Sequence, residues 1–72
     1  MAYVKKNNLT KLTKIRQDLG MTRAQLAEKS GVNARAIERY EQGRANINDA
    51  SVGRVRDLAR ALGVSIESIL DD

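Results

Sequence analysis

The chain has 72 residues, which is enough for one domain close to the size below which a core needs disulfides or metals for stability. It contains neither cysteine nor histidine, so disulfides and thiolate metal sites are excluded, and the commonest catalytic base and zinc ligand are missing. We therefore expect no metal, no cofactor and no enzymatic activity. Stability must come from packed helices rich in Leu, Ile, Val and Ala.

The net charge of +4 is unevenly divided along the chain. Residues 1–47 carry ten Lys and Arg against four Asp and Glu, whereas residues 48–72 carry three against five. A basic front half fits a surface that meets a polyanion such as DNA, although the asymmetry alone is better explained by an ordinary solvated surface. There is no apolar run of about 18 residues and no apolar stretch after Lys5 and Lys6, so we expect no membrane span, no signal peptide and a cytoplasmic location.

In chain order, residues 1–7 are expected to form a flexible N-terminal arm, and residues 8–72 one all-α domain. The first helix is predicted from about Leu9 to Leu19 with Asn8 as its N-cap, because its apolar residues recur at helical spacing. The glycines that follow the helical segments are typical of helix ends, where positive φ is needed.

The second helix is predicted to begin after Thr22 and to run to about Ser30. Thr22 and Gln25 have the spacing of a capping box, which marks a helix start. Gly31 then supplies the residue with easy access to positive φ that a tight turn needs. A third helix is predicted to begin after Asn33, a strong N-cap, and to end near residue 41.

A polar loop follows, in which Ile47 is expected to pack against the core. The fourth helix is predicted from about Asp49 or Ala50 to Leu62, with an apolar stripe along one face. A short fifth helix is predicted with Ser65 as its cap. The expected fold class is therefore all-α, a compact bundle of five helices.

The segment TRAQLAEKSGVNARAIERYEQG, residues 22–43, has the features of a helix-turn-helix. Ala27 is small enough for the second helix to approach the third, and Leu26, Ile37 and Tyr40 can fill the shared core. An ordinary helical hairpin would explain the glycine and the apolar residues equally well. It explains less well the polar face that remains on the third helix.

That polar face carries Arg35 and Arg39, which lie four residues apart and therefore point the same way. Arginine is the side chain best suited to bind guanine O6 and N7 with two hydrogen bonds. Two arginines alone indicate only a solvated helix, but on the open face of a helix-turn-helix they favour DNA contact. Glu38 beside them either repels phosphate or accepts a hydrogen bond from a cytosine amino group, and the sequence leaves both possibilities open.

The stretch from Leu12 to Leu70 resembles the phage repressor and Cro-type helix-turn-helix family, also called the XRE family, through LTKIRQDLGMTRAQLAEKSGVNARAIERYEQG and LARALGVSIESIL. The resemblance implies the lambda-repressor-like bundle of five helices, with the helix-turn-helix at helices 2 and 3. It also implies a sequence-specific DNA-binding transcription regulator that reads the major groove with the helix from Asn33 to Glu41.

The resemblance further implies roles for individual side chains. The positions implied to contact base edges are Asn33, Ala34, Arg35 and Arg39. Those implied to contact phosphates are Thr22, Arg23, Gln42 and Arg44. Arg16 and Glu41 match a family pair that forms a structural salt bridge between the first and third helices.

We expect a repressor that binds a pseudo-palindromic operator in double-stranded DNA as a weak homodimer and takes no small-molecule ligand. The dimer patch is expected near the fourth and fifth helices, around Val64, Ile66 and the C-terminal residues. Two alternatives remain open. The chain could be an antitoxin or a restriction-modification controller that represses its own operon, or a protein-binding adaptor that uses the same fold.

Overall fold

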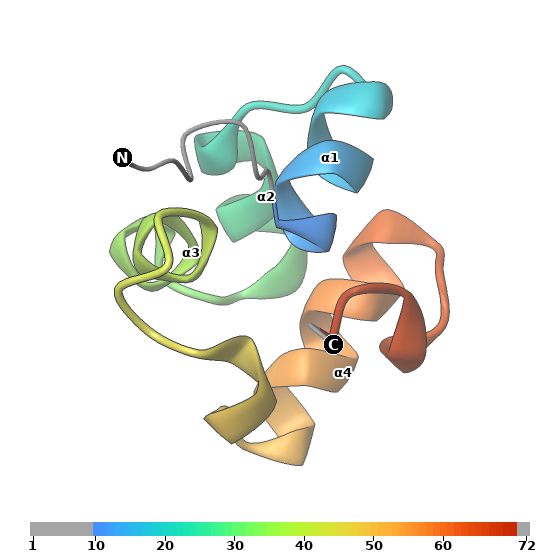
Figure 1. Ribbon diagram of the computed structural model, residues 1–72. Helices are drawn as coiled ribbons and strands as arrows, with labels where there is room; N and C mark the ends of the chain where they lie inside the picture. The colour runs from blue at the N-terminus through green and yellow to red at the C-terminus, as the bar shows by residue number, and fades with distance from the viewer. Residues whose placement is uncertain (1–9, 71–72) are drawn as a thin grey trace.

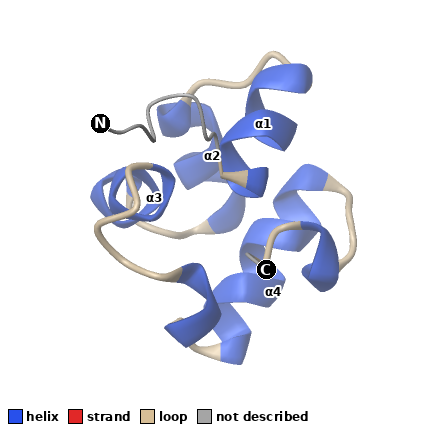
Figure 2. Cartoon of the chain, in the orientation of Figure 1, coloured by secondary structure: helices blue, strands red, loops and turns tan. Residues whose placement is uncertain are grey.

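The computed structural model describes residues 10–70. The predicted arm of residues 1–7 and the predicted cap Asn8 lie outside the described residues. The elements are α1 (Lys11–Asp18), α2 (Arg23–Ser30), α3 (Ala34–Glu41), the 3-10 turn η2 (Ile47–Asp49), α4 (Val52–Leu62) and the 3-10 turn η3 (Ile66–Ser68). All regular elements of this part of the chain are helical and are joined by loops, with no strand between residues 10 and 70 (Figure 2).

The two helices of the helix-turn-helix begin and end at the predicted residues. At the start of α2 the Thr22 hydroxyl accepts from the Gln25 amide at 3.0 Å, and the Gln25 side chain accepts from the Thr22 amide at 2.8 Å. The helix ends at Gly31, whose φ of +76° closes the turn. Asn33 then caps α3, since its side-chain oxygen accepts from the Arg35 amide at 2.7 Å.

Two predicted helix starts were wrong by two or three residues. Thr10 is the N-cap of α1, because its hydroxyl accepts from the Thr13 amide at 3.1 Å, so this helix begins two residues after Leu9. Ser51 is the N-cap of α4, where its hydroxyl accepts from the Arg54 amide at 3.2 Å. Asp49 and Ala50 were expected to open α4. Asp49 instead ends the separate turn η2, and Ala50 has an extended backbone.

The predicted fifth helix is a single 3-10 turn, so the expected bundle of five helices has four α-helices. In η3 the amides of Ser68 and Ile69 donate to carbonyls three residues back, at 3.1 Å each, which is the 3-10 pattern. The Ser65 hydroxyl pairs with the Ser68 hydroxyl at 2.8 Å and caps no backbone amide. The apolar spacing located this turn correctly but could not distinguish it from an α-helix.

The core lies where α2 packs against both α3 and α4. Its fully buried side chains are Leu12, Leu26, Ile37, Leu58 and Ile69. Ile47 is also buried, as predicted from the sequence. In Figure 1 α3 is seen almost along its axis at the left edge of the bundle, while α4 runs from the lower centre to the right and the C-terminal turn lies at the right. One face of α3 is therefore left outside the core.

Candidate nucleic-acid interface

Helix α3 has a buried face and an exposed face. Ile37 and Tyr40 are buried in the core, where they fix the position of the helix. Ala34, Arg35 and Arg39 are exposed on the other side. The structure thus places three of the four residues expected to contact base edges together on the outward face of one helix. Asn33, the fourth, stands exposed at its N-terminus.

The two outward arginines have no partner within the described part of the chain. Neither Arg35 nor Arg39 forms an ion pair there, whereas Arg16 and Arg23 each pair with Glu41. Their guanidinium groups keep all five N–H donors for an external acceptor. Two cations held on an open helix face also create a positive potential that attracts a polyanion.

Two surface hollows flank α3, and both arginines line both of them. The first hollow, of about 310 Å³, lies between α3 and α4 and is also lined by Asn33, Tyr40 and Arg54. We call it the α3–α4 pocket. The second hollow, also of about 310 Å³, lies toward the C-terminal end of α3 and is lined in addition by Glu38, Gln42 and Arg44.

Gln42 and Arg44, expected to contact phosphates, both stand exposed beyond the end of α3. The Gln42 side-chain amide donates to the Glu38 carboxylate at 3.0 Å. This hydrogen bond holds Glu38 against its own helix and uses one of the two N–H donors of Gln42. In the second hollow the carboxylate of Glu38 therefore offsets part of the charge of the arginines.

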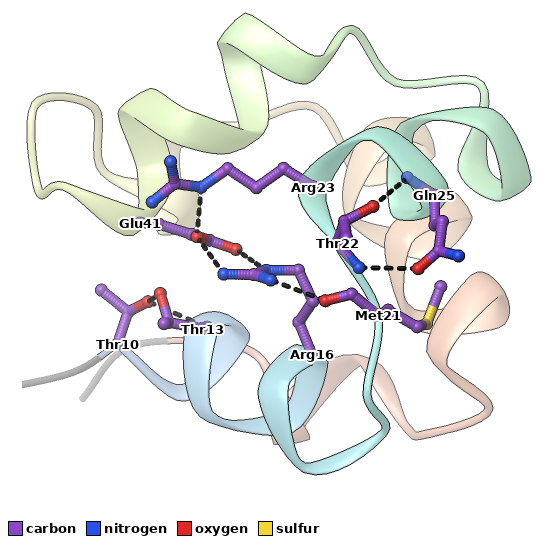
Figure 3. A network of polar contacts seen from close by, with 8 residues as sticks. All are labelled: Thr10, Thr13, Arg16, Met21, Thr22, Arg23, Gln25 and Glu41. Carbon is purple, nitrogen blue, oxygen red and sulfur yellow. Dashed lines mark hydrogen bonds and ion pairs between the residues drawn. The ribbon is translucent and has the colours of Figure 1, made fainter.

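A polar network joins α1, α2 and α3 around Glu41, whose side chain is only 1% exposed (Figure 3). Arg16 binds this carboxylate with two nitrogens, Nε to Oε2 at 2.6 Å and Nη2 to Oε1 at 3.0 Å. Its third nitrogen, Nη1, donates to the Met21 carbonyl at 2.7 Å. Arg16 thus connects α1 to the end of α3 and to the loop before α2.

Arg23 joins the same carboxylate, which the sequence analysis did not foresee. Its Nε donates to Glu41 Oε1 at 2.7 Å, while its side chain stays 40% exposed. Arg23 and Thr22 lie at the N-terminus of α2, but the Thr22 hydroxyl accepts from the capping box amide. Of these two predicted phosphate contacts, Thr22 uses its hydroxyl within the capping box, and Arg23 is held at the surface by its ion pair with Glu41.

Arg54 was not among the residues predicted to lie at the interface. It lies in the first turn of α4, is exposed, and donates from Nη1 to the Tyr40 hydroxyl of α3 at 3.2 Å. The only available signal was an arginine close to a helix start. Its place beside α3 depends on how the two helices pack, which residue spacing does not give.

Comparison with known proteins identifies the chain by its family and fold. The helix-turn-helix family matches residues 12–69, which is most of the chain. Comparison with curated protein sequences finds no match. The crystal structure of the restriction-modification controller protein C.AhdI from Aeromonas hydrophila is similar, with a TM-score of 0.74 and 25% sequence identity over 83% of this chain and 86% of that one.

No helix between residues 10 and 70 has both the length and the apolar character needed to cross a bilayer. The matched range includes α2, the turn at Gly31 and α3, together with the buried residues that hold them. The chain belongs to the helix-turn-helix family of the Cro/C1 (XRE) type and is a DNA-binding transcription regulator.

Proposed function

We propose that the protein is a sequence-specific repressor that places α3 in the major groove of its operator. The observation that carries the proposal is the exposure of Arg35 and Arg39, without partners in the described chain, opposite the buried Ile37 and Tyr40. A helix of this kind fits the major groove, and an outward arginine matches the O6 and N7 acceptors of guanine. Repression follows if the operator overlaps a promoter. The protein then acts in the cytoplasm, with the DNA.

The remaining contacts follow from the same docking. Asn33 uses its side-chain oxygen to cap α3, so its amide nitrogen remains a donor for a base edge or a phosphate. Ala34 is small enough to let the helix sit deep or to touch a thymine methyl. The residues that would meet the DNA backbone on the two sides of α3 are Thr22, Arg23, Gln42 and Arg44.

We further propose a weak homodimer on a pseudo-palindromic operator, because one small domain gives limited affinity alone. Val64 and Ile66, in the expected patch, are half-buried against the core and leave part of their apolar surface outside. Two copies joined there would present two α3 helices to half-sites about 34–36 Å apart.

Selection of random duplexes with the purified protein at a stated salt concentration tests sequence-specific binding directly. Arg35→Ala and Arg39→Ala should each weaken binding to the selected site by about 1–3 kcal/mol and relax the base preference at one position. Lys29→Ala, which removes an exposed charge near the far end of α2, is the matched control and should preserve the preference. Unchanged affinity in both arginine variants would favour a protein-binding adaptor instead.

The likeness to a restriction-modification controller favours a second candidate within the same class of function. Under it, the protein would repress its own operon, as would an antitoxin. Binding to the DNA upstream of its own gene, together with a restriction enzyme or a toxin encoded beside it, would support this candidate. Selected sites absent from that DNA would exclude it.

A further inference from the structure

We propose that the α3–α4 pocket binds a phosphate group and that Arg54 is one of its ligands. Three arginines, Arg35, Arg39 and Arg54, line this pocket together with Asn33, and no acidic residue is among its lining residues. The second hollow shares two of these arginines but contains Glu38. Because acidic groups repel anions, the α3–α4 pocket is the better site for a phosphate.

Arg54 is held in place for this role by α3. Its Nη1 donates to the hydroxyl of Tyr40, a buried residue whose ring cannot move freely, so less side-chain freedom is lost when an anion binds. The other four N–H donors of Arg54 remain available, and within residues 10–70 it forms no ion pair. The positive end of α4 adds to the field at the first-turn position of Arg54.

The phosphate can come from two sources. The first is a backbone phosphate of the operator, and this source rests on the proposed function. If α3 enters the major groove, the side of α3 that faces α4 meets one of the two flanking strands, so Arg54 would reach a phosphate beside the bases that Arg35 or Arg39 contacts. The second source is a free phosphate, which would bind without DNA.

Arg54→Ala separates these sources when DNA binding is measured over a range of salt concentrations. Arg60→Ala is the matched control, because Arg60 is exposed, lies near the other end of α4 and is not among the residues that line the pocket. If the source is a DNA phosphate, we expect Arg54→Ala to weaken DNA binding about five- to tenfold relative to the control, by the same factor on every DNA sequence. We also expect the slope of the logarithm of affinity against the logarithm of salt concentration to be smaller by about 1 in Arg54→Ala, whereas Arg54→Lys should retain most of that slope.

The second arm is a titration of the free protein with inorganic phosphate, followed by NMR of the arginine side-chain N–H groups, with chloride at matched ionic strength as reference. Saturable shifts in the wild type that Arg54→Ala abolishes, with no extra loss of DNA affinity, identify a free phosphate as the source. Loss of base preference in Arg54→Ala would instead make it a base contact and overturn the proposal. The absence of an effect in both arms would also overturn the proposal, even if Arg35→Ala still weakened specific binding and so upheld the proposed function.

Discussion

At the scale of single residues, Glu41 connects the parts that position the recognition helix. Its carboxylate is almost completely buried and accepts hydrogen bonds from Arg16 and Arg23, which come from different helices. Charge-assisted bonds of this length are strong, and a carboxylate left without them in the interior would be costly. The end of α3 is thereby tied to α1 and α2.

Replacing Glu41 should therefore destabilise the fold more than replacing Arg23, the partner that is open to water. Glu41→Ala leaves Arg16 almost buried without its partner, so we expect a loss of about 3 kcal/mol in the free energy of unfolding. Arg23→Ala should cost less than about 1 kcal/mol, since this side chain is 40% exposed. Urea denaturation followed by circular dichroism measures both values. Equal losses in the two variants would contradict this account.

The sequence indicated some of these residues and not others, for a physical reason. Arg35 and Arg39 could be found because they share one helix, where a spacing of four residues fixes their common direction. Arg16 and Glu41 could be paired only through the family resemblance. The contacts of Arg23 with Glu41 and of Arg54 with Tyr40 depend on how separate helices pack, and no residue spacing within a helix encodes them.

At the scale of elements, the hydrogen bonds at helix ends decide where each helix begins. The starts of α2 and α3 were predicted correctly because Thr22 forms a capping box with Gln25 and because Asn33, a strong N-cap, follows the turn at Gly31. Before α4 several residues are of a type that can act as an N-cap. Ser51, which follows the separate turn η2, is the one that caps the helix. Short apolar patterns locate an element but do not give its type, as the turn η3 shows.

Removing an N-cap side chain that accepts a hydrogen bond from a backbone amide should lower the free energy of unfolding more than removing one that accepts none. Thr22→Ala removes one half of the capping box and should lower the free energy of unfolding by about 1 kcal/mol. Ser65→Ala, the matched control, removes a hydroxyl that caps no amide and should change it by less than about 0.5 kcal/mol. Thermal unfolding of the two variants side by side tests the difference, and a costlier Ser65→Ala would refute it.

The glycines of two elements should respond oppositely to alanine. Gly31 has a φ of +76°, which an alanine adopts at a cost of about 1–2 kcal/mol even though open space surrounds it. Gly53 lies within α4, and an added Cβ would meet only the end of the Arg56 side chain at 3.8 Å. Gly53→Ala should therefore raise the stability by about 0.5–1 kcal/mol. Differential scanning calorimetry measures both shifts, and a loss of stability in Gly53→Ala would show an unrecognised constraint.

At the scale of the whole molecule, charge and apolar surface govern how copies meet DNA and each other. Between residues 10 and 70, the exposed large apolar side chains are Val52 at 73% and Leu19 at 53%, so apolar surface is also available outside the expected dimer patch. Which apolar side chains stay exposed depends on how the helices pack together, and residue spacing within one helix does not predict this. Four arginines, Arg35, Arg39, Arg44 and Arg54, line the two hollows beside α3.

Assembly on the operator should involve two copies of the chain. We expect sedimentation velocity to show a mainly monomeric free protein with concentration-dependent dimerisation, and a complex with two protomers on one selected duplex. A duplex with a single half-site should bind more weakly, because the second protomer then lacks its half of the contacts. A single protomer bound to the full operator at every concentration would rule out the dimer.

The most direct test of the central claim, that Arg35 and Arg39 contact bases in the major groove, replaces each candidate guanine of the selected site by 7-deazaguanine. This change removes only the N7 acceptor. The wild type should lose about 1–3 kcal/mol of binding free energy at a contacted guanine, whereas the variant lacking the contacting arginine should lose less than about 0.5 kcal/mol. Equal losses in the wild type, Arg35→Ala and Arg39→Ala at every guanine would contradict the account.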